Sequence, residues 1–202
     1  MNIKLYLLYI MGIIPTFGNI GVLVASLYPA FIVTFLVVAS IFNLKINGLI
    51  YFFGILITFG LCYSMALLFN KERTGSDISC DLFSTLGYPY KNPSFQSAVT
   101  VFTYVYLLIP MVSNSLLNPV VLAILPIFSL INMVYLNVKG CASVTGLFMG
   151  SVIGALLATF MVGILSLSGN KDLLFYNELV SNNVICKKPS KQMFKCSVYK
   201  GG

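Results

Sequence analysis

The chain has 202 residues, of which 58% are hydrophobic and only 8% are charged, and its mean hydropathy is +0.95. A soluble domain carries about 25% charged residues, so this chain has too few charged groups to cover a surface exposed to water. The composition excludes a soluble globular protein and predicts an all-α, polytopic membrane helix bundle. Histidine is absent, which removes the commonest general acid or base and the commonest metal ligand near neutral pH.

The first apolar stretch, residues 5–42, is too long for one simple crossing, because a membrane helix needs about 20 residues. Pro15 and the Phe17-Gly18-Asn19 sequence interrupt it. We therefore expect a short segment near 5–17, either crossing or re-entrant, and a full span near 21–42.

Pro29 is expected to kink the second segment, as membrane helices tolerate a proline when neighbours satisfy the freed carbonyl. A polar connection at 43–47 leads to a further apolar segment at about 48–69, which ends in a cluster of charges. Residues 70–96 then form the longest internal polar region. Connections of that length are usually functional or disordered.

Three more apolar segments are predicted at about 97–113, 119–136 and 145–168, which gives five to six transmembrane segments in total. In the last segment, glycines recur every four residues, at positions 146, 150 and 154. Small residues at this spacing let two membrane helices approach closely. We expect them to serve packing within the chain rather than dimerisation.

The C-terminal region is polar and basic. From Lys171 onward it carries six lysines against Asp172 and Glu178. The positive-inside rule places this tail in the cytoplasm. The chain is thus divided into a helical bundle at 1–168 and a basic cytoplasmic tail at 169–202, and the polar regions 70–96 and 137–143 share the opposite side of the membrane.

The five cysteines form no Cys-x-x-Cys pair, and no histidine is present to complete a zinc set, so neither a metal site nor a cofactor is expected. Cys62 lies in an apolar run and is interpreted as core filling. Cys80 and Cys141 fall on the same side of the membrane, where they either pair or remain two free thiols. A disulfide between Cys186 and Cys196 is disfavoured in the cytosol.

The stretch KNPSFQSAVTVF, Lys91 to Phe102, takes a polar sequence directly into an apolar helical pattern. Serine is a good helix cap and proline is common near helix starts, so Pro93 and Ser94 have a purely structural interpretation. The same residues would also suit a phosphate site, because helix-start amides and nearby cations hold phosphate.

The order of elements over roughly residues 45–168 resembles the type-2 phosphatidic acid phosphatase superfamily of membrane lipid phosphatases. A helix ends in a basic cluster, a loop follows, a Pro-Ser motif opens the next helix, and a short connection joins the last two helices. In that family, cations and helix-start amides hold the phosphate, one histidine donates a proton to the leaving oxygen, and a second attacks phosphorus while an aspartate orients it.

Placed on this chain, Pro93 and Ser94 match the family's Pro-Ser positions, whereas the catalytic positions are replaced. Gln96 stands where the acid histidine would be, Ala142 where the nucleophilic histidine would be, and Gly146 where its aspartate would be. The resemblance therefore implies an inactive scaffold. The phosphate-binding candidates are Lys71, Arg73, Lys91, Ser94 and Lys139, although these cations have an alternative role in flanking membrane segments and reaching toward the headgroups.

The sequence thus predicts an integral membrane protein that resembles lipid phosphatases, lacks their activity, and binds phospholipid or polyprenyl phosphate. Anionic or phosphate-bearing membrane lipids are the expected partners, and nothing points to nucleic acid. The alternative is a structural multi-span scaffold acting through a protein partner at the tail, whose sequence CKKPSKQMFKCSVYKGG resembles the ends of such proteins in large DNA viruses. A transporter or channel is disfavoured, because the spans contain essentially no charged groups.

Overall fold

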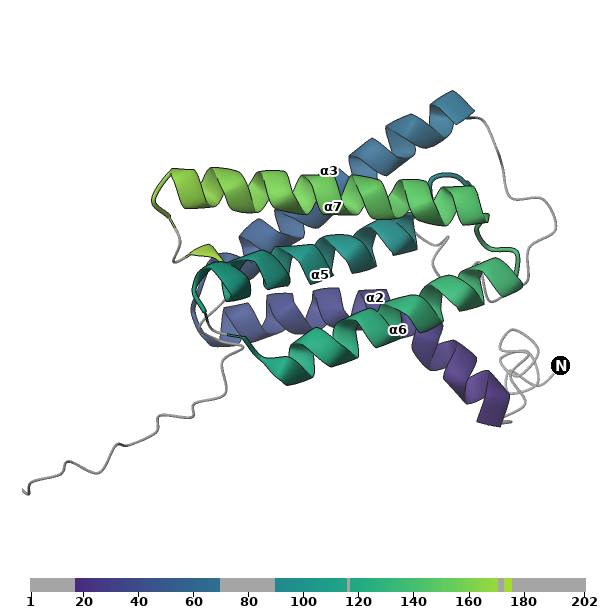
Figure 1. The fold of residues 1–202 in the computed structure, drawn as a ribbon, viewed down its shortest axis with the longest axis horizontal. Coiled ribbons are helices and arrows are strands. Elements are labelled where there is room, and N and C mark those ends of the chain that lie inside the picture. Colours follow the sequence, from purple (N-terminus) through teal and green to yellow (C-terminus); the bar gives the residue numbers. More distant parts are fainter. Residues whose placement is uncertain (1–16, 70–89, 116, 171–172, 176–202) are drawn as a thin grey trace, which may run out of the picture.

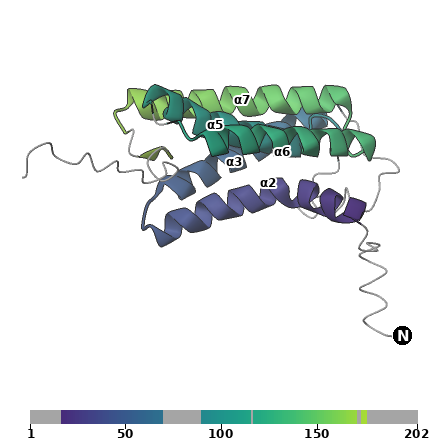
Figure 2. The ribbon, with the colours of Figure 1, turned by 60° about the horizontal axis from the view of Figure 1, so that its bottom comes forward.

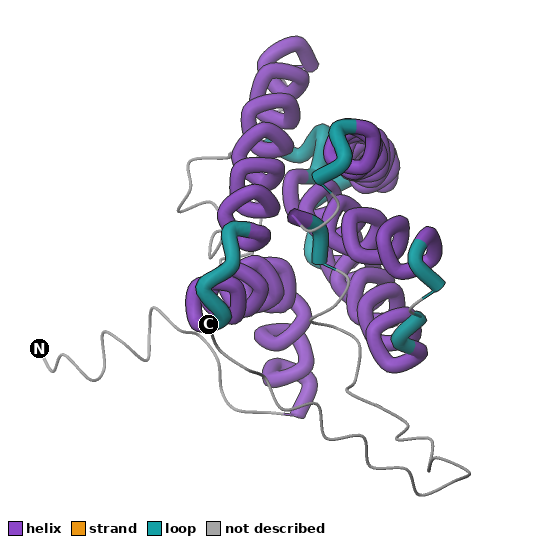
Figure 3. The backbone as a smooth tube through the Cα atoms, turned by 90° about the vertical axis from the view of Figure 1, so that its left-hand side faces the viewer, coloured by secondary structure: helices purple, strands orange, loops and turns teal. Residues whose placement is uncertain are grey.

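The structure is a computed structural model that describes residues 17–69, 90–115, 117–170 and 173–175, with side chains described from Leu27 onward. The described residues form helices and loops, without a strand (Figure 3). The five helices are α2 (Phe17–Phe42), α3 (Asn47–Phe69), α5 (Phe95–Ser113), α6 (Pro119–Val138) and α7 (Val144–Leu167) (Figure 1).

The predicted segments for α3, α5, α6 and α7 agree with the observed helices to within two residues at each end. The predicted interruption at Phe17-Gly18-Asn19 is wrong, because α2 begins at Phe17 and includes all three residues. They occupy the first turn, where the backbone N–H groups have no partner within the helix, so a glycine and an asparagine cost little there. The rest of the predicted 5–17 segment lies outside the described residues.

Four of these helices, α3, α5, α6 and α7, are long and apolar enough to cross a membrane. In α2, the part whose side chains are described, Leu27–Phe42, is apolar but shorter than a full span. Large apolar side chains cover their outward faces. Val134, Phe148 and Phe160 are between 62% and 70% exposed. A soluble protein would not present such a surface to water, whereas acyl chains cover it in a bilayer. The described part of the chain is therefore an all-helical membrane bundle with four helices of spanning length. The predicted fifth and sixth spans are not established by the described residues.

The bundle has two polar ends, which are named here after their lysines. At the Lys45 end lie the α2–α3 connection, the α5–α6 connection and the end of α7; at the Lys91 end lie the starts of α5 and α7 and the end of α6 (Figure 1). Helices α5 and α7 run parallel and side by side in both views (Figures 1 and 2). Their starts are thus brought together at one end of the bundle.

Figure 1 also shows that α2 changes direction partway along its length. Pro29 is its one proline, and a proline inside a helix removes a backbone hydrogen bond and crowds the preceding turn. The bend in α2 agrees with the predicted kink at Pro29.

An aromatic cluster forms the core near the Lys45 end. Tyr51 packs with its ring centroid 6.0 Å from Phe102 and 5.5 Å from Tyr106. Its hydroxyl lies 2.6 Å from the Thr103 hydroxyl. Phe175, which sequence reasoning assigned to the tail, meets the edge of Tyr51 at 6.2 Å and is buried. The packed core therefore includes residues that follow the last helix.

Candidate functional site at the Lys91 end

Helices α5 and α7 both begin with a serine N-cap. The Ser97 N–H donates to the Ser94 hydroxyl at 3.4 Å, so Ser94 is the N-cap of α5. The Gly146 N–H donates to the Ser143 hydroxyl at 3.0 Å, so Ser143 caps α7. Each cap satisfies one of the backbone N–H groups that a helix start leaves without a partner. The structural interpretation of Ser94 as a helix cap is confirmed.

The glycines of α7 let its backbone lie directly against α5. A Cβ atom added at Gly150 would lie closer than 3.0 Å to the Ser94 carbonyl oxygen, and one added at Gly154 would meet the Ala98 carbonyl oxygen as closely. At Gly146 the obstruction would be the Asn92 side chain and the Lys91 carbonyl oxygen. The glycine stripe therefore serves packing within the chain, as the sequence predicted.

This close approach allows hydrogen bonds between the two helix starts. The Ser94 N–H donates to the Gly146 carbonyl at 2.8 Å. The Ser97 hydroxyl donates to the Leu147 carbonyl at 2.8 Å and lies 2.8 Å from the Ser151 hydroxyl. The Ser143 hydroxyl donates to the Asn92 side-chain oxygen. We call this set the α5–α7 junction; its members are Asn92, Ser94, Ser97, Ser143, Gly146, Leu147 and Ser151.

The junction joins the two polar regions that the sequence placed on one side of the membrane. Its α5 side is buried: Asn92, Ser94 and Ser97 are 6%, 4% and 0% exposed. Their polar atoms are engaged in caps and cross-helix bonds. The Ser94 hydroxyl is therefore a structural group, and a ligand at this end would meet the rim of the junction rather than its interior.

Gln96, Ala142 and Gly146, which the sequence comparison with lipid phosphatases singled out, provide no acid or base. Gln96 is buried in the first turn of α5, and among the described residues no hydrogen-bond partner reaches its Oε1. Ala142 is buried in an apolar cluster with Leu136 and Leu147, and Gly146 lies against Asn92. An amide, a methyl group and a glycine cannot transfer a proton at a useful rate.

Two of the cationic candidates lie at this end. Lys91 is half-buried and directly precedes the buried Asn92, and Lys139 is exposed at the C-cap of α6. Lys71 and Arg73, the other two, lie outside the described residues. The described part of the site therefore consists of the two parallel starts of α5 and α7, with Lys91 shortly before α5 and Lys139 at the end of α6.

Cys141 is disulfide-bonded and buried next to this junction, whereas Cys62 is buried in α3 and is not part of a disulfide. The predicted core role of Cys62 is confirmed by its packing against Ala66 and Ala98. The partner of Cys141 lies outside the described residues, so pairing with Cys80 stays a prediction. Among the described residues, no cluster of side chains suited to a metal ion is present.

Sequence reasoning missed the residues that build the junction, apart from Ser94 and Gly146. A signal for Ser143 was present, because a serine directly before an apolar helical pattern is typical of an N-cap. Ser97 and Ser151 gave no such signal, since their pairing depends on two helices 50 residues apart. No known protein family, curated protein or solved structure compared with this chain matches it.

Proposed function

We propose that this membrane protein binds a phosphate-bearing lipid headgroup at the Lys91 end and does not hydrolyse it. The observation that supports this most is the α5–α7 junction, which holds two parallel helix starts side by side at the end of the bundle that carries Lys91 and Lys139. Helix N-termini carry partial positive charge and favour anions. Two such ends and two lysines at the membrane surface suit a phosphate group.

Binding without hydrolysis fits the residue types at this end. The whole chain lacks histidine, and the described residues at the junction carry serine and asparagine side chains without a carboxylate. Removing a catalytic nucleophile typically lowers the rate by orders of magnitude. Descent from a lipid phosphatase of the type-2 phosphatidic acid phosphatase superfamily, with loss of its catalytic groups, would account for the Pro93-Ser94 motif, and Lys71 and Arg73 would then add to the same headgroup site.

The test uses the full chain in lipid nanodiscs and phosphatidic acid carrying a photoreactive group at its headgroup end. Crosslinks are mapped by mass spectrometry and are expected within 90–97 and 139–146. Each basic residue near a membrane surface contributes roughly 1 kcal/mol, which corresponds to about a five-fold loss for Lys91→Ala or Lys139→Ala. Lys45→Ala, which removes the same charge at the other end, is the matched control and should change crosslinking at these residues less than two-fold.

Two results would contradict the proposal. Equal crosslinking by the wild type and the Lys91→Ala, Lys139→Ala double variant would exclude the headgroup site. Release of inorganic phosphate from phosphatidic acid or polyprenyl diphosphate above the protein-free background, abolished by Ser94→Ala, would show that the protein is an enzyme.

A structural multi-span protein that works through its tail is the second candidate. The observation that favours it is the engagement of the Asn92, Ser94 and Ser97 polar groups in internal bonds, which makes the junction a packing element. Under this alternative, removing residues 182–202 abolishes co-purification of protein partners, and the headgroup crosslinks described above are absent.

A further inference from the structure

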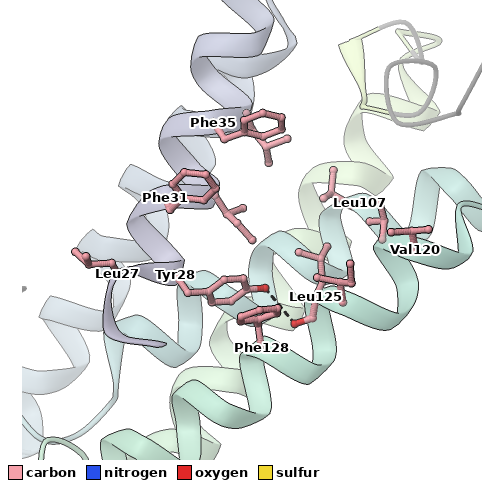
Figure 4. Close-up of a pocket in the computed structure, with 12 residues that line it drawn as sticks. Leu27, Tyr28, Phe31, Phe35, Leu107, Val120, Leu125 and Phe128 are labelled. Atoms are coloured by element: carbon pink, nitrogen blue, oxygen red, sulfur yellow. Dashed lines mark hydrogen bonds between the residues drawn. The ribbon is translucent and has the colours of Figure 1, made fainter. Parts of the chain in front are cut away.

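A separate, apolar feature lies between α2, α5 and α6, away from the polar site at the Lys91 end. It is a groove of about 570 Å³, within the range typical of small-molecule sites. Phe31 and Phe35 of α2 face Leu107 of α5 and Val120 of α6 across it (Figure 4). The lining residues recur every four positions along α2 and α6, so the groove runs parallel to the helices.

The floor and one end of the groove are built from fixed contacts. Leu36, Leu107 and Leu125 at its floor are buried. Tyr28 stacks on Phe128 with ring centroids 5.4 Å apart, and its hydroxyl donates to the Leu125 carbonyl at 3.0 Å, which joins α2 to α6 (Figure 4). Because that hydroxyl is bonded, the groove offers apolar surface, and a water molecule would lack the polar partners it needs.

The groove has the length of one leaflet. Val120 is the second residue of α6, and Phe128 lies eight residues further on, or roughly 12 Å at 1.5 Å per residue. Half of a hydrocarbon core of about 30 Å is about 15 Å. The groove therefore extends from the membrane surface at the Lys45 end to near the middle of the bilayer, where Tyr28 and Phe128 close it.

The side of the groove that faces away from the bundle meets the bilayer. Phe31 and Phe35 are 69% and 56% exposed. The exposed Lys45 lies in the α2–α3 connection at this end of the bundle, three residues after the end of α2, which forms one wall of the groove. A cation at a membrane surface attracts anionic headgroups.

We propose that this groove holds one acyl chain of an anionic phospholipid of the leaflet at the Lys45 end, with its headgroup beside Lys45. This site lies in the opposite leaflet from the headgroup site at Lys91 and does not depend on it. A single chain aligned with the helices matches the direction, length and apolar lining of the groove. Burial of each methylene group contributes about 0.8 kcal/mol relative to water, but an acyl chain in bulk lipid is already removed from water. Only better packing in the groove therefore favours binding there over bulk lipid.

The experiment uses the full chain in phosphatidylcholine nanodiscs with a trace of phosphatidylglycerol that carries a diazirine in its acyl chain. In the wild type, crosslinks on the groove residues of α2 and α6 should exceed those on the outward face of α7 by at least five-fold. Equal labelling of these helices would show only annular lipid and would overturn the proposal.

Groove-filling variants test the site itself. Ile124 lines the groove and is 46% exposed; Ile131, two turns further along α6, is 48% exposed and lies outside the groove. Ile124→Trp should lower crosslinking to α2 at least five-fold, and Ile131→Trp should change it less than two-fold. Val120→Trp and Val134→Trp, at 60% and 62% exposed, form a second matched pair if the first variant does not fold. Undiminished crosslinking in both folded groove variants would refute the site.

The headgroup is tested by a second probe with the same diazirine chain on phosphatidylcholine. The anionic probe should crosslink to the groove several-fold more than the neutral one, and Lys45→Gln should remove this preference. Equal crosslinking by the two probes in the wild type would refute the anionic headgroup.

Discussion

The contact between α5 and α7 predicts that a glycine-to-alanine change destabilises the protein at one position of α7 and does not at another. A Cβ atom at Gly150 would lie closer than 3.0 Å to the Ser94 carbonyl oxygen, whereas one at Gly163 would meet nothing within 4 Å. The obstruction at Gly150 is backbone, so it cannot be relieved by a side-chain rotation. Gly150→Ala must push the two helices apart, and Gly163→Ala need not move anything.

The magnitudes follow from the contacts. Overpacking a well-packed site costs about 1–3 kcal/mol. Separation of the helices also weakens the bond from the Ser94 N–H to Gly146 and the bond between Ser97 and Ser151, each worth roughly 0.6 kcal/mol inside a membrane protein. Alanine favours a helix over glycine by about 1 kcal/mol. Gly150→Ala should therefore destabilise the protein by about 1–3 kcal/mol, and Gly163→Ala should leave it unchanged or stabilise it by up to about 1 kcal/mol.

The assay is unfolding of the purified protein in mixed micelles by increasing mole fraction of sodium dodecyl sulfate, followed by the far-ultraviolet circular dichroism of its helices. The midpoint for Gly150→Ala should fall below that of the wild type, and the midpoint for Gly163→Ala should not. Similar shifts of the midpoint in the same direction for both variants would contradict the conclusion that Gly150 is needed for the close contact between α5 and α7.

Two further predictions concern the core and the disulfide. Tyr51→Phe removes the hydroxyl that lies 2.6 Å from Thr103 but keeps the ring contacts, so the same unfolding assay should show a loss of about 1 kcal/mol, and a loss above 3 kcal/mol would contradict this assignment. Cys141 should react with maleimide only after reduction of the unfolded protein, and peptide mapping without reduction should join it to Cys80. Labelling of Cys141 without reduction would contradict the disulfide, and a peptide joined to Cys186 or Cys196 would contradict the predicted side of the membrane.

The candidate site was predictable only in its outline. The sequence predicted that Pro93-Ser94 and the 137–143 connection lie on one side of the membrane, because two predicted spans separate them. It did not indicate that Ser97 would pair with Ser151, since neither residue has a local signature and the contact exists only where α5 meets α7. The same holds for the groove, whose walls come from three helices.

The sequence by itself determined the class of protein and the positions of its membrane helices, because a bilayer requires about 20 apolar residues to cross it and helix caps such as Ser94 act locally. It also indicated which face of α7 packs closely, through Gly146, Gly150 and Gly154. Only the tertiary structure decided that this face meets α5, that Phe175 joins the core and that Cys141 is bonded. These features depend on contacts between residues distant in the chain, which local propensity and hydrophobic period do not specify.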